Sequence, residues 1–135
     1  MKKKEIIQDI LTKFGYRPEI DSDGDIKIVY QLKNIYVITR GDEEDHYVTV
    51  LLPQFRRVEE DDKMLELVVC NKITRDLKLA KVFFDTDFTT VSASCEFFFT
   101  DEASMEKSLF HSLQVLGIVR SLFRKEKEYL ATDEE

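Results

Sequence analysis

The segment 65–85 constrains the fold of this chain more than any other stretch of its sequence. Its first part, 65–75, has the apolar spacing of an α-helix and carries Asn71 among apolar neighbours. A short link leads into the strand-like run 78–84, and Asp-Thr-Asp at 85–87 then supplies the residue types of a tight turn. A helix followed at once by a hairpin predicts a domain in which helices pack on an antiparallel sheet. The segment holds no nucleophile beside a base and no cluster of metal ligands, so it indicates an architecture and no reaction.

The residues before this segment predict one helix and three strands. The helix is expected over 3–14, where apolar residues recur at helical spacing, and Gly15 should cap its C-terminus in a left-handed conformation. Pro18 then prevents a return to helix. Strands are expected over 26–30, 35–40 and 47–52, joined by the short links 31–34 and 41–45, and Pro53 should end the third strand.

The remaining elements predict the fold class. A second helix is expected over 61–75, followed by strands over 78–84 and 88–100 and a final helix over 101–129. Gly117 should let that final helix approach a neighbour closely. The result is an α+β fold in the order α-β-β-β-α-β-β-α, with a five-stranded, mainly antiparallel sheet and helices on one face. Residues 1–135 are expected to form a single domain whose tail frays after about residue 130.

The balance of charge argues against two classes of partner. The chain has 27 Asp and Glu against 20 Lys and Arg, a net charge of −7. Because an acidic surface repels phosphate backbones and anionic lipids, we expect neither nucleic-acid nor membrane binding. No apolar run approaches membrane-spanning length or forms the core of a signal peptide, which predicts a cytoplasmic protein. Cys70 and Cys95 lie in apolar elements and are expected to be small buried residues rather than a disulfide.

No group of residues predicts a catalytic or metal site. The run Asp21-Ser22-Asp23-Gly24-Asp25 resembles the start of a calcium loop, but its glycine is in the fourth position instead of the sixth, and Leu32 replaces the terminal Glu. A plain turn is the preferred interpretation. His46 and His111 have no cysteine or second histidine at ligand spacing. We therefore expect no catalytic residue, no metal and no cofactor.

Asn71 shares its side of the second helix with apolar residues, namely Met64, Leu67 and Val68. A buried amide without partners costs about 1–3 kcal/mol, so its side chain should have found hydrogen bonds. The structural hypothesis is that it ties the helix end to nearby backbone. A ligand-facing amide is the alternative, and we favour the structural role.

The strand pattern also predicts which residues share a face of the sheet. If Tyr30 pairs with Ile35, the face that the helices cover collects Ile26, Ile28, Tyr30, Ile35 and Val37. The opposite face then carries the candidate partner-binding residues Val29, Tyr36, Ile38, Tyr47 and Leu51. Apolar and aromatic residues gathered on an open face are typical of protein interfaces. The alternative is a merely exposed face screened by polar neighbours, because scattered exposed apolar residues are common.

The element order and the middle segment together resemble the YbjN family of bacterial proteins, named as sensory transduction regulators, which share a fold with type III secretion chaperones. The resemblance extends from Ile6 to about Phe123. It is sharpest in Val68-Val69-Cys70-Asn71-Lys72 leading into Leu79-Ala80-Lys81-Val82-Phe83-Phe84, since similar proteins place an Asn near the end of the middle helix before such a strand. It implies one type III secretion chaperone-like domain over 1–135. It carries over no active site, and Asn71 only as a structural residue.

Two functions follow as expectations. The chaperone relatives bind partner proteins and dimerise, so the resemblance implies a non-enzymatic, cytoplasmic protein-binding or regulatory module that forms a homodimer. The alternative is a small-ligand sensor with a pocket between the helices and the sheet. A hydrolase or transferase ranks below both, because the sequence shows no acid–base constellation.

Overall fold

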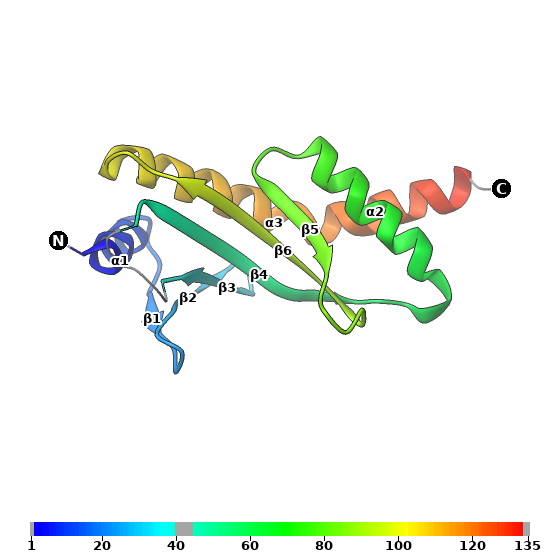
Figure 1. The fold of residues 1–135 in the computed structure, drawn as a ribbon, viewed down its shortest axis with the longest axis horizontal. Coiled ribbons are helices and arrows are strands. Elements are labelled where there is room, and N and C mark those ends of the chain that lie inside the picture. The colour runs from blue at the N-terminus through cyan, green and yellow to red at the C-terminus, as the bar shows by residue number, and fades with distance from the viewer. Residues whose placement is uncertain (1, 40–44, 134–135) are drawn as a thin grey trace.

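An antiparallel sheet with helices packed on it makes up the described part of the chain (Figure 1). The computed structural model describes residues 2–39 and 45–133. In chain order the elements are α1 (Lys3–Lys13), β1 (Glu19–Ile20), β2 (Ile26–Tyr30), β3 (Lys33–Ile38), β4 (Tyr47–Arg57), the 3-10 turn η1 (Glu60–Asp62), α2 (Lys63–Asp76), β5 (Ala80–Phe84), β6 (Thr90–Phe98) and α3 (Glu102–Asp133). The strands lie side by side in the order β1-β2-β3-β4-β6-β5. The predicted α+β class is confirmed, but the described sheet has six strands in the order α-β-β-β-β-α-β-β-α.

The strand that the prediction lacked is β1. Its two residues pair with Ile26 and Lys27 of β2 across the 21–25 turn. Asp21 holds this turn, because its Oδ1 accepts hydrogen bonds from the backbone N–H groups of Asp23 and Asp25, both at 2.9 Å. Two residues are too few to show an alternating pattern, so periodicity could not reveal this strand.

Strand β4 continues to Arg57, so the prediction that Pro53 ends it is wrong. The register against β6 shifts between Leu52 and Arg56. Within the shift, Gln54 has a φ of 47° and donates its backbone N–H to Ser92 Oγ at 2.8 Å. A bulge of this kind tolerates a residue without an N–H, which is why the strand runs through the proline.

The hairpin between β2 and β3 is tighter than expected. Gln31 and Leu32 form its turn, with φ values of 50° and 67°, as in the turns that favour two-residue hairpins. Tyr30 therefore pairs with Lys33, and the predicted pairing of Tyr30 with Ile35 is wrong. The shift is by two residues, so every side chain still lies on the predicted face. The next predicted link, 41–45, lies outside the described residues except for its last position.

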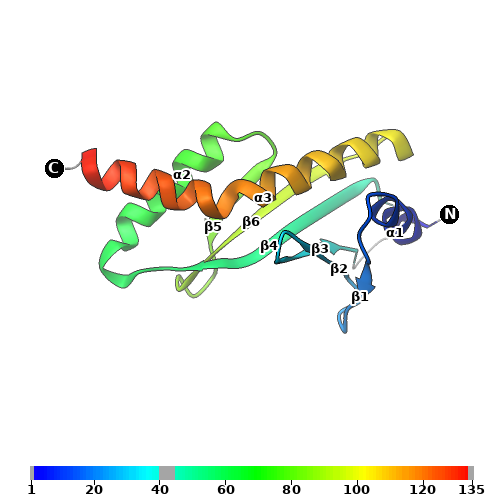
Figure 2. The same ribbon diagram turned by 180° about the vertical axis from the view of Figure 1, so that it is seen from behind.

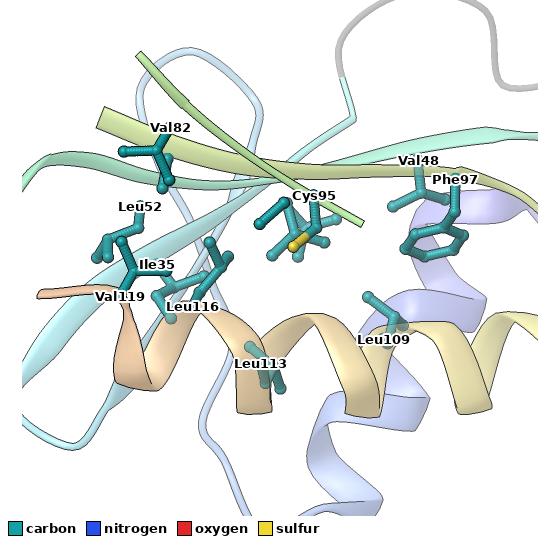
Figure 3. Close-up of a cluster of buried hydrophobic side chains, with 14 of the residues drawn as sticks. Ile35, Val48, Leu52, Val82, Cys95, Phe97, Leu109, Leu113, Leu116 and Val119 are labelled. Atoms are coloured by element: carbon teal, nitrogen blue, oxygen red, sulfur yellow. The ribbon is translucent and has the colours of Figure 1, made fainter. Parts of the chain in front are cut away.

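Helix α3 runs along the inner face of the sheet, where strand side chains meet its apolar stripe (Figure 3). Leu109, Leu113, Leu116 and Val119 of this helix are at most 2% exposed. Four of the five residues predicted to lie on the covered face are also buried, namely Ile26, Ile28, Ile35 and Val37, and the fifth, Tyr30, is partly buried against the same core. Figure 1 shows α1 at one end of the sheet and α2 at the other. The helices thus leave the opposite face of the sheet open.

Two glycines have the roles predicted for them. Gly15 has a φ of 98° and ends α1, with its N–H bonded to Thr12 O and that of Tyr16 bonded to Leu11 O. At Gly117, a Cβ atom would lie 2.6 Å from Cε1 of Tyr30. The absence of a side chain at Gly117 therefore lets β2 pack directly against α3.

Helix α2 covers the free edge of the sheet at β5. Thr74 Oγ1 accepts a hydrogen bond from the N–H of Val82 at 2.9 Å and donates one to its carbonyl oxygen at 3.2 Å. The side chain thereby satisfies backbone groups that an edge strand would otherwise expose for pairing.

Cys70 and Cys95 are buried free thiols, as predicted. Burial raises the pKa of Cys70 to about 12 and that of Cys95 to about 11, so both stay protonated at neutral pH. Among the described residues, none of the helices is both long and apolar enough to pass through a bilayer.

Candidate functional site

The five predicted partner-binding residues all lie on the outer face of the sheet, away from the helices. Strand β6 passes in front of α3 in Figure 1 and behind it in Figure 2, and β4 pairs with β6, so the outer face of these strands points away from that helix. The strand register places Tyr36 beside Leu51, Ile38 beside Thr49, and Tyr47 beside Phe98. Four of the predicted residues are half-buried by their neighbours, and Val29 is 56% exposed.

Phe98 belongs to this face, although the prediction did not include it. It is 78% exposed, and its ring centroid lies 5.2 Å from that of Tyr47. The alternation of β6, which places Ser94 and Glu96 outward, also places Phe98 outward. The sequence therefore held the signal for this residue. We name Val29, Tyr36, Ile38, Tyr47, Leu51 and Phe98 the outer-face patch.

A polar group lies within this patch. Glu96 accepts a hydrogen bond from the Tyr47 hydroxyl and forms an ion pair with Lys81 Nζ at 2.7 Å. The bonds from Lys81 and Tyr47 hold the pKa of Glu96 below its ordinary value. The hydrogen bond that the Tyr47 hydroxyl donates to Glu96 raises the pKa of Tyr47. The patch therefore combines apolar area with a carboxylate that stays ionised at neutral pH.

Asn71 lies on the same side of α2 as Met64, Leu67 and Val68, as predicted, but this side faces solvent. The three apolar side chains are 73%, 39% and 46% exposed, and Asn71 is exposed as well. Its amide makes no hydrogen bond with any described residue, so the expected burial and backbone contact are wrong. The helix has a second apolar stripe, and that one packs against the core; it consists of Val69, Cys70 and Ile73.

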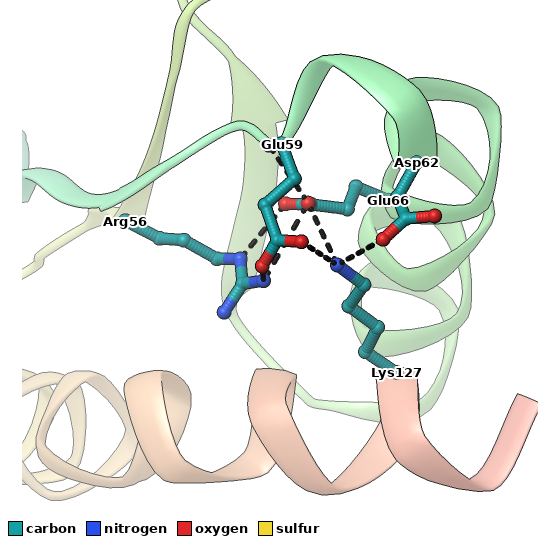
Figure 4. Close-up of polar contacts among 5 residues, drawn as sticks. All are labelled: Arg56, Glu59, Asp62, Glu66 and Lys127. Carbon is teal, nitrogen blue, oxygen red and sulfur yellow. Dashed lines mark hydrogen bonds and ion pairs between the residues drawn. The ribbon is translucent and has the colours of Figure 1, made fainter. Parts of the chain in front are cut away.

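The buried polar side chain of α2 is Glu66, which the sequence analysis missed. It is 0% exposed and accepts hydrogen bonds from Arg56 Nε at 2.8 Å, the Glu59 N–H at 3.0 Å and Lys127 Nζ at 3.1 Å (Figure 4). Asp62 also pairs with Lys127, at 2.9 Å. Glu66 precedes Val69, Cys70 and Ile73 of the buried stripe by three, four and seven residues, and this helical spacing is the signal that could have identified it.

Charge in this cluster outweighs the effect of burial. Burial alone would raise the pKa of Glu66, but the bonds from Arg56, Glu59 and Lys127 together lower it. Lys127 has a raised pKa for the corresponding reason: its bonds to the carboxylates overcome its desolvation. The cluster joins β4, α2 and α3, and every charge in it has a partner, so its geometry is that of a structural tie.

The remaining polar candidates bring no catalytic group together in the described part of the chain. Carboxylate oxygens of Asp21, Asp23 and Asp25 lie within 4.8 Å of one another, but Asp21 is occupied in holding its own turn. The rings of His46 and His111 contact Phe99 and Phe110, and neither imidazole bonds a described serine or cysteine.

Comparison with known proteins identifies the family. Residues 2–116 match the family model TY-Chap1, described as T3SS (YopN, CesT) and YbjN peptide-binding chaperone 1. The chain resembles the crystal structure of YbjN from E. coli with a TM-score of 0.63 and 8% identity, over 93% of this chain and 92% of that one. An uncharacterized protein from Methanothermobacter thermautotrophicus gives a TM-score of 0.51 and 14% identity, over 89% and 98% of the two chains. These two likenesses show the fold alone, and no curated protein matches. On the family match over most of its length, the chain belongs to the TY-Chap1 family of type III secretion and YbjN peptide-binding chaperones.

Proposed function

We propose that this protein is a non-enzymatic, cytoplasmic module that holds a peptide or partner protein against its outer-face patch. The observation that carries the proposal is the open sheet face, where none of the described helices lies over the six large side chains of the patch. The peptide-binding description of the family supports the same class of ligand.

Covering the apolar side chains of the patch would supply favourable free energy for binding. A large apolar side chain contributes about 1.5–3 kcal/mol when it is fully covered, and part of that is still available at each patch residue. The Glu96–Lys81 pair offers charged groups to orient a polar ligand atom. Because an apolar patch loses exposed area when it packs against the same patch of a second copy, we propose that two copies associate through this face.

The substitution Tyr36→Asp tests this proposal, since it places a charge in the middle of the patch without touching the inner core. Fluorescence anisotropy with labelled peptides of alternating apolar residues measures binding, and light scattering over a dilution series measures association. We expect Tyr36→Asp to weaken peptide binding about tenfold or more while circular dichroism stays unchanged. Tyr129→Asp is the matched control, because Tyr129 is 62% exposed on the far part of α3.

The outcomes separate the alternatives. Equal peptide affinity and equal association in the wild type and both variants would mean that the patch is only exposed sheet surface. Loss of association with peptide binding retained would assign the patch to self-contact alone.

A small-ligand sensor is the second candidate. A hollow of about 180 Å³ lies between α1, β2 and α3, lined by Phe14, Tyr16, Tyr30, Phe110, Leu113 and Gln114. It is smaller than the usual range for ligand pockets of roughly 300–1,000 Å³, so the protein-binding proposal ranks first. Stabilisation of the wild type by a small aromatic compound, abolished in Leu113→Phe, would favour the sensor instead.

A further inference from the structure

A basic groove lies on the helix side of this acidic protein, away from the outer-face patch. Two adjoining hollows of about 400 and 260 Å³ share Arg120 and Arg124 of α3. The first is also lined by Lys33 of the β2–β3 hairpin, and the second by Arg56 and Arg57 at the end of β4. Glu59 lines the second hollow too, but its carboxylate is already paired with Arg56 and Lys127. Figure 2 shows the hairpin and β4 passing beneath the middle of α3. Five cationic side chains thus converge in a chain whose net charge is −7.

Four of the five cations in this groove have no acidic partner among the described residues, and Arg56 is the exception. Ion pairs occupy Lys3, Lys13, Lys63, Lys72, Arg75, Lys81 and Lys127. Arg56 is likewise bound to Glu59 and Glu66. By contrast, Arg57, Arg120 and Arg124 form no ion pair or hydrogen bond with the described residues, and all three are exposed. Their guanidinium groups are therefore available to an anion from outside.

The fold holds these arginines in place. Arg120 and Arg124 are four residues apart, so they lie one turn apart on the same side of α3. The hairpin that carries Lys33 is fixed against that helix by the contact of Tyr30 with Gly117. Arg57 follows the β4 bulge, next to Arg56, whose guanidinium carbon lies 4.9 Å from the centre of the Phe123 ring. The walls of the groove are thus set before any ligand arrives.

We propose that this groove binds an acidic segment of a client polypeptide through its Asp and Glu carboxylates. Guanidinium groups form paired hydrogen bonds with carboxylates, and three unpaired arginines can take several such groups. Leu32, which is 99% exposed, and Phe55 also line the groove, so apolar residues beside the acids have contacts too. A long nucleic acid or an anionic membrane would extend beyond the groove and meet the repulsion of the net negative charge, whereas a short acidic segment needs to contact only the groove.

The probe is a fluorescently labelled short peptide that alternates Glu and Asp with Leu and Phe. Its reference is the same peptide with Gln and Asn in place of the acids. In anisotropy titrations of the whole protein, we expect the acidic peptide to bind at least tenfold more tightly than its amide reference. We expect added salt to reduce this difference, because screening weakens exposed charge pairs.

The groove variant is the double substitution Arg120→Gln and Arg124→Gln. We expect it to remove the preference for the acidic peptide. The matched control is Lys107→Gln with Lys125→Gln, which removes the same charge from exposed positions of α3 outside the groove lining. We expect that control to bind as the wild type does. Tyr36→Asp should also keep the acidic preference, so failure of the groove and failure of the outer-face patch can be told apart.

Several results would overturn the proposal. One is that the wild type binds the acidic and the amide peptide with equal affinity. A second is that the groove variant binds the acidic peptide as tightly as the wild type does. Another is tighter binding of inorganic phosphate or a short oligonucleotide than of the acidic peptide, which would make this a phosphate site. A change in self-association of the groove variant by light scattering would assign the arginines to contact with a second copy.

Discussion

The two faces of the sheet are built from the same kinds of strand residue and yet differ in what covers them. On the inner face, Val48, Val50 and Leu52 of β4 are at most 3% exposed, because α3 packs over them. On the outer face, Tyr47 and Leu51 of the same strand are only half-buried, because no described element lies over them. Alternation along a strand decides which residues share a face, but an element from elsewhere in the chain decides which face becomes core.

The adjacent residues Leu52 and Leu51 allow the sharpest test of this comparison. Leu52→Ala removes a side chain that is 3% exposed and leaves a cavity against α3. We expect the free energy of unfolding to fall by about 2–5 kcal/mol. Urea unfolding followed by circular dichroism measures the loss. A loss no larger than that of Leu51→Ala would contradict the assignment of the inner face.

The two bonded carboxylates extend the comparison to charge. Glu66 on the helix side is fully buried, whereas Glu96 lies on the outer face and is partly exposed. At pH 7 we expect Glu66→Gln to lower the free energy of unfolding by about 2–3 kcal/mol, because it weakens bonds from Arg56 and Lys127. Glu96→Gln should lower the free energy of unfolding by a smaller amount, since solvent screens the ion pair between Glu96 and Lys81.

The pH dependence of Glu66→Gln has a definite sign. The pKa of Glu66 is lower in the folded protein than in the unfolded chain, so its ionisation stabilises the fold above the unfolded pKa. That stabilisation is lost as pH falls through the folded pKa. We therefore expect the difference in the free energy of unfolding between the wild type and Glu66→Gln to become smaller as the pH is lowered from 7. A difference that stays constant or widens would mean that the carboxylate does not titrate in this way.

Leu51→Ala is the outer-face counterpart of Leu52→Ala. Because its side chain is half-exposed in the free protein, we expect a loss of only about 1 kcal/mol in unfolding free energy. Peptide binding or self-association should weaken in the same variant, whereas Leu52→Ala should affect stability first. A stability loss as large as that of Leu52→Ala would show that something covers the outer face in the free protein.

Asn71→Leu should give the smallest effect. The side chain is exposed on α2 and makes no hydrogen bond with described residues, so the free energy of unfolding should change by no more than about 0.5 kcal/mol. Thermal unfolding of the wild type and the variant checks this. A large loss would restore the structural role first inferred from the sequence.

Much of the fold could be predicted because local patterns carry it. The helix over 3–13, its cap at Gly15 and the close contact at Gly117 each follow from residue types within a few positions. The face assignment survived an error in the β2–β3 register because a shift by two residues keeps the alternation. The candidate binding residues on the outer face are consequently those that the sequence had indicated, with Phe98 added.

The errors have physical causes of their own. Proline at position 53 predicts the end of a strand, but pairing with β6 continues beyond a bulge in which the Gln54 N–H bonds Ser92, a residue distant in sequence. Asn71 was expected in the core because α2 carries two apolar stripes, and periodicity cannot say which of them is covered. Contact with β5 and α3 settles that question in favour of Val69, Cys70 and Ile73.

The sequence resembled a known family, and its local patterns by themselves determined the α+β class, the approximate elements and the residues that share each strand face. The class, the elements and the shared faces depend on chemistry between near neighbours, which repeats at fixed intervals along a helix or strand. Only the tertiary structure decided that Glu66 is buried and that arginines from α3 and β4 line a groove with the hairpin. Glu66 and Lys127 are 61 residues apart, and their meeting depends on how whole elements pack, a property that no local pattern contains.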